Sequence, residues 1–154
     1  MYLSIQGINN EGGFRNEEKN IFGASSMLST KDVDVAIKDV ILKLPELFGN
    51  YDIIDKARNI ISNEKALAAL DRLDKIYSII DSYGLSKYVS FDLGMLTQYQ
   101  YYTGMIFKAY TYGVGDAIVK GGRYDTLLSQ FGKKAPAIGF VILIDDFYSL
   151  SKIT

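Results

Sequence analysis

The stretch YSIIDSYGLSKYVSFDLGML, from Tyr77 to Leu96, changes its hydrophobic period at Gly84. Before Gly84, apolar residues recur at the helical spacing of three and four, in a stripe made of Ala66, Leu70, Leu73, Tyr77 and Ile80. After Gly84 the period is two, and the alternating apolar residues are Val89, Phe91, Leu93 and Met95. The sequence therefore predicts a helix near 63–83 that ends at Gly84, followed by a half-buried strand near 88–95.

Two further helical patterns precede this stretch. Apolar residues at helical spacing run from Val33 to Leu44, with Pro45 and Gly49 after them, which predicts a helix near 31–48. A shorter helix is expected over 51–61, and Ser62 has the position of an N-cap for the next one. The stripe on that last helix can face a partner helix or the chain's own sheet, and its spacing favours the sheet.

Strand patterns dominate the rest of the chain. Alternation predicts strands near 99–112 and 117–124, joined by the glycine-rich turn YGVGD, with a short helix around Leu127 to Phe131 closed by Gly132. The uninterrupted apolar run AIGFVILI, residues 137–144, predicts a strand covered on both faces. Tight turns between consecutive strands indicate an α+β fold with a mainly antiparallel sheet.

The first 28 residues have a different character. The start MYLSIQGI can form one strand, but INNEGGFRNEEKN, from Ile8 to Asn20, is polar and lacks periodicity. We therefore divide the chain into a weakly structured arm, 1–28, and a folded part, 29–154, whose helical segment is 31–83.

Composition excludes several kinds of site. The chain of 154 residues has no Cys and no His, which excludes disulfides, zinc–thiolate sites, and Ser–His or Cys–His nucleophiles within it. A net charge of −1 gives no general attraction to nucleic acid, and no apolar run approaches the roughly 18 residues of a membrane span. We expect a cytoplasmic protein without a metal, a cofactor, a nucleic-acid partner or a membrane partner.

An aromatic hairpin is the candidate for binding. It combines YYTGMIFKAY, from Tyr101 to Tyr110, with GGRYD, from Gly121 to Asp125. Tyr102 and Tyr124 can face the same way on neighbouring strands, and Gly104, Gly121 and Gly122 would leave room between them. Arg123 can meet a ligand carboxylate, or it can pair with Asp92 or Asp125. These residues alone leave a small-ligand pocket and simple aromatic packing equally open.

Three blocks in this order carry a family resemblance: YYTGMIFKAY, GGRYDTLLSQFG and PAIGFVILIDDF. Together they resemble the C-terminal part of the class II histidyl-tRNA synthetase catalytic fold, from about Tyr88 to Leu150. The segment LPELFG, from Leu44 to Gly49, resembles the same family more loosely. The resemblance implies a partial class II aminoacyl-tRNA synthetase-like fold, preceded in the whole protein by further motifs that are not found here.

Two positions depart from the synthetase pattern. Thr97 stands where the synthetases have a catalytic arginine, and Asp146 stands where they have an arginine that contacts ATP phosphates. At an effective dielectric constant of about 20, a unit charge pair about 4 Å apart is worth roughly 4 kcal/mol, so a carboxylate opposes ATP binding strongly. The stretch FDLGML, from Phe91 to Leu96, and the acidic pair after the last strand are instead similar to the ATP phosphoribosyltransferase regulatory-subunit family.

That resemblance implies a non-enzymatic role in the first step of histidine biosynthesis. The implied partner is the short-form catalytic subunit of ATP phosphoribosyltransferase, the implied effector is histidine, and a homo-oligomer is expected of the full-length form. The implied histidine pocket comprises Tyr101, Tyr102, Thr103, Gly104, Gly121, Gly122, Arg123 and Tyr124. The alternatives are a fragment of a divergent histidyl-tRNA synthetase and a sheet domain whose tyrosines only pack.

Overall fold

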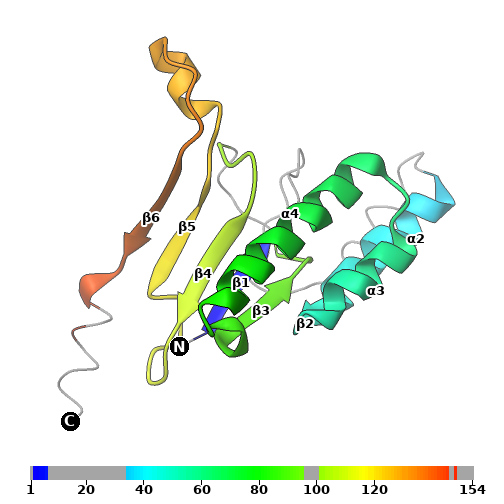
Figure 1. Ribbon diagram of the computed structural model, residues 1–154, viewed down its shortest axis with the longest axis horizontal. Helices are drawn as coiled ribbons and strands as arrows, with labels where there is room; N and C mark the ends of the chain where they lie inside the picture. Colours follow the sequence, from blue (N-terminus) through cyan, green and yellow to red (C-terminus); the bar gives the residue numbers. More distant parts are fainter. Residues whose placement is uncertain (1, 7–33, 96–100, 146–147, 149–154) are drawn as a thin grey trace.

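The computed structural model describes residues 2–6, 34–95, 101–145 and 148, and it combines helices with one sheet (Figure 1). The helices of the described part are α2 (Val35–Lys43), α3 (Asp52–Ile60) and α4 (Glu64–Ser82). The strands are β1 (Tyr2–Gln6), β2 (Phe48–Gly49), β3 (Val89–Asp92), β4 (Ile106–Tyr110), β5 (Val119–Arg123) and β6 (Ile138–Ile142). Short 3-10 turns lie at η1 (Leu44–Glu46), η2 (Ser86–Tyr88) and η3 (Leu127–Phe131).

The strands form one sheet in the order β2-β3-β1-β4-β5-β6. Every neighbouring pair is antiparallel except β1 and β3, which run parallel. The predicted α+β class and mainly antiparallel sheet are therefore confirmed. The strand expected in the first eight residues is also confirmed, and it lies inside the sheet between β3 and β4, whereas the rest of the predicted arm lies outside the described residues.

Helix α4 packs its apolar stripe on the sheet, as its spacing predicts. Leu70 and Leu73 are buried in one core cluster with Phe91, and the other stripe residues pack against that cluster. Figure 1 shows α4 lying across β1 and β3, with β5 and β6 extending beyond the helices. We call the surface of the sheet toward α4 the helix face, and the opposite surface the far face.

The N-cap of α4 differs from the prediction by one residue. The Asn63 side chain accepts hydrogen bonds from the backbone N–H groups of Lys65 at 3.0 Å and Ala66 at 3.1 Å. Asn63, not Ser62, therefore caps the helix, because its side-chain oxygen reaches the first free backbone donors. At the other end, Gly84 adopts a φ of 68°, the left-handed conformation that suits glycine after a helix.

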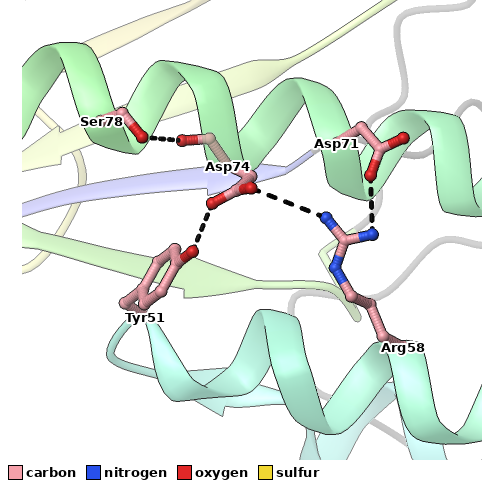
Figure 2. Close-up of polar contacts among 5 residues, drawn as sticks. All are labelled: Tyr51, Arg58, Asp71, Asp74 and Ser78. Atoms are coloured by element: carbon pink, nitrogen blue, oxygen red, sulfur yellow. Dashed lines mark hydrogen bonds and ion pairs between the residues drawn. The ribbon is translucent and has the colours of Figure 1, made fainter.

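Polar side chains join α4 to α3 and to Tyr51, the residue that precedes α3 (Figure 2). The Tyr51 hydroxyl donates to the Asp74 carboxylate, and the Tyr51 ring stacks on Tyr77 with centroids 4.3 Å apart. Arg58 from α3 lies 2.6 Å from Asp71 and 3.8 Å from Asp74. The hydrogen bond to Asp74, followed by burial, raises the pKa of Tyr51. These contacts fix how α3 lies against the helix that covers the sheet.

Two strand predictions need correction. The strand expected over 99–112 begins only at Ile106, and residues 96–100 lie outside the described part. The carbonyl of Arg123 accepts a hydrogen bond from the N–H of Thr103, while the N–H of Arg123 donates to the carbonyl of Met105. The chain therefore loops out between Thr103 and Met105 instead of continuing the ladder.

The run 137–144 forms a strand, as predicted, but its expected burial on both faces is wrong. β6 is the last strand of the sheet, and most of its residues are exposed. An apolar run is equally compatible with a central strand and an edge strand, because its sequence does not say how many neighbours it has.

Candidate functional site

A pair of glycines on adjacent strands forms the floor of the candidate site. Gly122 of β5 lies opposite Gly139 of β6, so both face the same side of the sheet. A Cβ atom at Gly122 would lie 2.6 Å from the Tyr102 ring, and one at Gly139 would lie 2.5 Å from the Tyr124 hydroxyl. Tyr102 and Tyr124 therefore lie over the same face, as the sequence predicts, each against a backbone that lacks a side chain.

Tyr101 joins these two tyrosines into one cluster. Its ring centroid lies 4.5 Å from that of Tyr102 and 5.9 Å from that of Tyr124, the latter in an edge-on arrangement at 84°. Its hydroxyl also donates to the hydroxyl of Tyr102 at 3.4 Å. We call Tyr101, Tyr102 and Tyr124 the tyrosine cluster. It combines aromatic surface with hydroxyls that can donate and accept hydrogen bonds, which suits a small polar ring.

The loop that carries the tyrosine cluster is held to the end of β5. Thr103 receives a hydrogen bond on its Oγ1 from the backbone N–H of Asp125 at 2.8 Å. The Arg123 guanidinium nitrogen Nε lies 2.8 Å and 2.9 Å from the two carboxylate oxygens of Asp125. Asp92 and Asp125 were the two partners considered for Arg123 within the chain, and the structure shows the ion pair with Asp125.

The predicted site residues do not all lie on one face. Phe107 packs against the core under α4, and a Cβ at Gly121 would lie 2.6 Å from its ring, so Gly121 belongs to the helix face. Arg123 follows two residues later and lies on the same face. The Arg123 side chain packs against Gly104, and its Cδ would lie 3.1 Å from a Cβ atom added there. The expectation that Gly104, Gly121 and Gly122 leave room between the tyrosines is therefore wrong, because Tyr102 covers Gly122 and the other two glycines pack elsewhere.

The helix face carries a separate cleft between α4 and the ends of the outer strands, with a volume of about 1190 Å³. Thr103, Gly104 and Arg123 line it together with Lys65, Arg72 and Lys75 of α4. Sequence reasoning missed these α4 residues as site candidates. Lys65 and Arg72 are seven residues apart and Arg72 and Lys75 are three apart, so the three cations lie on one flank of the helix, beside the apolar stripe. This spacing is the signal that could have identified them.

Charged side chains of β4 and β5 also lie on the far face. Lys108 and Lys120 lie opposite each other, and Lys120 pairs with Asp116 at 2.6 Å. That ion pair, together with the backbone N–H of Ala117, lowers the pKa of Asp116. Burial, and then the carboxylates of Asp116 and Asp92, raise the pKa of Tyr110. The tyrosine cluster is thus continuous with a polar surface on which a charged ligand can be accommodated.

The two positions that depart from the synthetase pattern, Thr97 and Asp146, lie outside the described residues. Within those residues, no helix has the length and apolar character needed to cross a membrane.

Comparisons with known proteins agree on the family. A family model for histidyl-tRNA synthetase matches residues 15–147, so the match begins within the segment 1–28 that the sequence analysis set apart as an arm. The ATP phosphoribosyltransferase regulatory subunit of Acetivibrio thermocellus is 45% identical over 80% of this chain, and that of Ruminiclostridium cellulolyticum is 39% identical over 92%. These alignments cover 30% and 36% of the two relatives, so the chain spans about a third of their length.

Solved structures give the same result. A Bacillus halodurans protein, an ATP phosphoribosyltransferase regulatory subunit/histidyl-tRNA synthetase, superposes with a TM-score of 0.79 at 32% identity, covering 94% of this chain and 42% of that one. Histidyl-tRNA synthetase from Nostoc superposes with a TM-score of 0.70 at 22% identity, over 86% of this chain and 33% of that one, which supports the fold. On the family match and these folds together, the chain belongs to the histidyl-tRNA synthetase family and has its class II fold.

Proposed function

We propose that this chain is part of a regulatory subunit of ATP phosphoribosyltransferase and does not activate an amino acid itself. The observation that carries the proposal is its identity of 39–50% to several proteins of that name. The proposed partner is the catalytic subunit of the transferase, and the proposed effector is histidine. Asp146 stands where the synthetases have an arginine, and its carboxylate would repel the ATP phosphates that the arginine attracts. This difference supports a protein that does not form an adenylate.

The tyrosine cluster supports an amino-acid pocket. Tyr102 is only 9% exposed, so a ligand that reaches its hydroxyl is shielded from water. Tyr124 projects its hydroxyl over Gly139, where no side chain stands in the way. In the proposed complex, these hydroxyls hydrogen-bond the imidazole nitrogens of histidine, one accepting from the ring N–H and the other donating to the unprotonated nitrogen.

Histidine binding by the full-length protein tests this pocket. Tyr102→Phe and Tyr124→Phe each remove one hydroxyl and keep the ring, which leaves a buried polar partner unsatisfied at a cost of about 1–3 kcal/mol. The dissociation constant measured by calorimetry should rise roughly ten- to hundredfold. Tyr83→Phe is the matched control, because Tyr83 is 75% exposed at the end of α4. If all three variants bind histidine like the parent, the tyrosines only pack the sheet.

The enzymatic alternative is tested separately. A divergent histidyl-tRNA synthetase would exchange labelled pyrophosphate into ATP in the presence of histidine, whereas the proposed regulatory subunit would not. The same full-length protein should raise the phosphoribosyl transfer rate of the short-form catalytic subunit when the two are mixed. Histidine-dependent pyrophosphate exchange, or failure to affect the catalytic subunit, would contradict the regulatory assignment whatever the outcome at the tyrosines.

A further inference from the structure

A free amino acid at the tyrosine cluster would bring a carboxylate whose charge the three tyrosines do not neutralise. Phenolic hydroxyls can donate hydrogen bonds to a carboxylate, but they carry no positive charge at neutral pH. Hydrogen bonds from a cationic donor to a carboxylate are about twice as strong as those between neutral groups. A cation on the far face would therefore bind the charged end of such a ligand more strongly than a hydroxyl. This inference rests on the proposed function, in which the ligand is histidine.

The six described strands contain three basic residues, Lys108, Lys120 and Arg123. Arg123 lies on the helix face, where its Nε is 2.8 Å from a carboxylate oxygen of Asp125. It is therefore on the opposite side of the sheet from a ligand at the tyrosine cluster. Lys108 and Lys120 lie on the far face, opposite each other on β4 and β5.

Lys120 already has a carboxylate partner. Its Nζ lies 2.6 Å from an oxygen of Asp116, four residues before it in the chain. Asp116 also accepts a hydrogen bond from the backbone N–H of Ala117 at 2.6 Å, and the two contacts lower the pKa of its carboxyl group. Asp116 therefore stays ionised near neutral pH, and a ligand carboxylate would have to displace it to reach Lys120.

Lys108 has no such partner. Its side chain is half-buried, and it forms no hydrogen bond or ion pair within the part of the chain that the structure describes. Asp116 acts on it only at longer range, as the weakest of the influences on the pKa of that carboxyl group. Like charges directly opposite each other on paired strands destabilise a sheet. The sheet therefore holds a cation beside the tyrosine cluster whose charge is not compensated by a close acidic group.

We propose that Lys108 binds the α-carboxylate of the amino acid whose ring lies on the tyrosine cluster. Gly122 pairs with Ile106, so Lys108 is the diagonal neighbour of Gly122 on the same face. Diagonal positions of an antiparallel pair are about 7–8 Å apart, which is within reach of a long side chain. Because the Tyr102 ring covers Gly122, the Lys108 ammonium can approach the edge of the cluster along the far face. The ligand ring then contacts the tyrosines, and its carboxylate accepts a hydrogen bond from Nζ.

Calorimetric titration of the full-length protein with L-histidine and with L-histidinamide tests this assignment. The amide keeps the size and planarity of the carboxyl group and removes its charge. The parent should bind histidine about ten- to hundredfold more tightly than the amide, since the amide loses a charge-assisted hydrogen bond. Lys108→Gln should weaken histidine binding by a similar factor, and it should no longer distinguish the two ligands.

Lys87→Gln is the matched control. It removes the same charge from an exposed residue of η2, before the end of β3 that is remote from the tyrosine cluster, and it should keep the preference for histidine. Thermal unfolding separates a binding role from a structural one. Because Lys108→Gln removes the repulsion with Lys120, its Tm should equal or exceed that of the parent.

The outcomes separate this inference from the proposed function. A parent that binds histidine and its amide equally overturns the inference alone, and so does a Lys108→Gln variant that keeps the preference of the parent. An equal loss of preference in Lys87→Gln, or a clearly lower Tm for Lys108→Gln, overturns it as well, because the effect would then come from net charge or from folding. A parent that binds neither ligand contradicts the proposed histidine pocket itself.

Discussion

Replacing Gly122 with alanine tests the packing that positions the tyrosine cluster. The new Cβ would lie 2.6 Å from two atoms of the Tyr102 ring and 2.9 Å from the carbonyl oxygen of Met105. Carbon atoms in contact are normally about 3.5–4.0 Å apart, so the ring or the backbone must move by roughly 1 Å. The carbonyl of Met105 is held by the N–H of Arg123, and Tyr101 packs beside the ring, so neither side gives way freely.

The expected cost follows from this geometry. Forcing an extra methyl group into a packed site typically costs about 1–3 kcal/mol. For a chain of this size, about 2 kcal/mol corresponds to a decrease in Tm of roughly 4–8 °C. Because the ring of Tyr102 must shift, the near-ultraviolet circular dichroism of the tyrosines should change as well, and the full-length protein should bind histidine more weakly.

Gly115→Ala is the matched control for this substitution. A Cβ at Gly115 would have no atom within 4 Å, and its backbone is outside the left-handed region. It should be neutral or stabilise the protein by about 0.4–1 kcal/mol, because alanine restricts the unfolded chain. Thermal unfolding followed by circular dichroism compares the two variants. If Gly122→Ala melts with the parent and leaves the tyrosine signal unchanged, Tyr102 does not pack against Gly122 and the site geometry is wrong.

Two further predictions concern the helices that support the sheet. Asn63→Ala removes the cap of α4, so it should lower the free energy of unfolding measured in urea by about 1 kcal/mol. Ser62→Ala should leave that free energy unchanged. Equal effects of the two substitutions would refute the cap assignment. The pKa of Tyr51 is raised in the folded state, so its hydroxyl contributes stability below about pH 10 that is lost as the pH rises through the folded value. Between about pH 9 and pH 11, the free energy of unfolding of Tyr51→Phe should therefore fall less than that of the parent. If the two proteins give parallel profiles of this free energy against pH, the contribution of the hydroxyl is ruled out.

Local periodicity was sufficient to predict most elements. The change of period at Gly84 separates α4 from β3 because helix and strand bury side chains with different repeats. Glycine at φ 80° closes the turn after Phe131, as the sequence indicates at Gly132. These features depend on neighbours a few residues apart, which is why the sequence alone reveals them.

Long-range neighbours were not predictable in the same way. The parallel pairing of β1 with β3 joins residues that are far apart in the chain, and neither strand's sequence specifies it. The exposure of β6 was missed for the same reason, because an apolar run does not reveal whether a second neighbour exists. The loop at Thr103 was missed because alternation continues through it, although its backbone leaves the ladder.

The division of the predicted site between two faces changes what each residue can do. Arg123 was considered as a donor for a ligand carboxylate, but its guanidinium is paired with Asp125 and lines the cleft on the helix face. A ligand on the tyrosine cluster lies on the other side of the sheet, where the nearby cations of β4 and β5 are Lys108 and Lys120. Loss of binding in Tyr102→Phe or Tyr124→Phe therefore reports on the far face alone, and a ligand held by Arg123 in the cleft would be insensitive to both substitutions. The tyrosine variants thus distinguish the implied pocket from the cleft, although residues of both were predicted as one site.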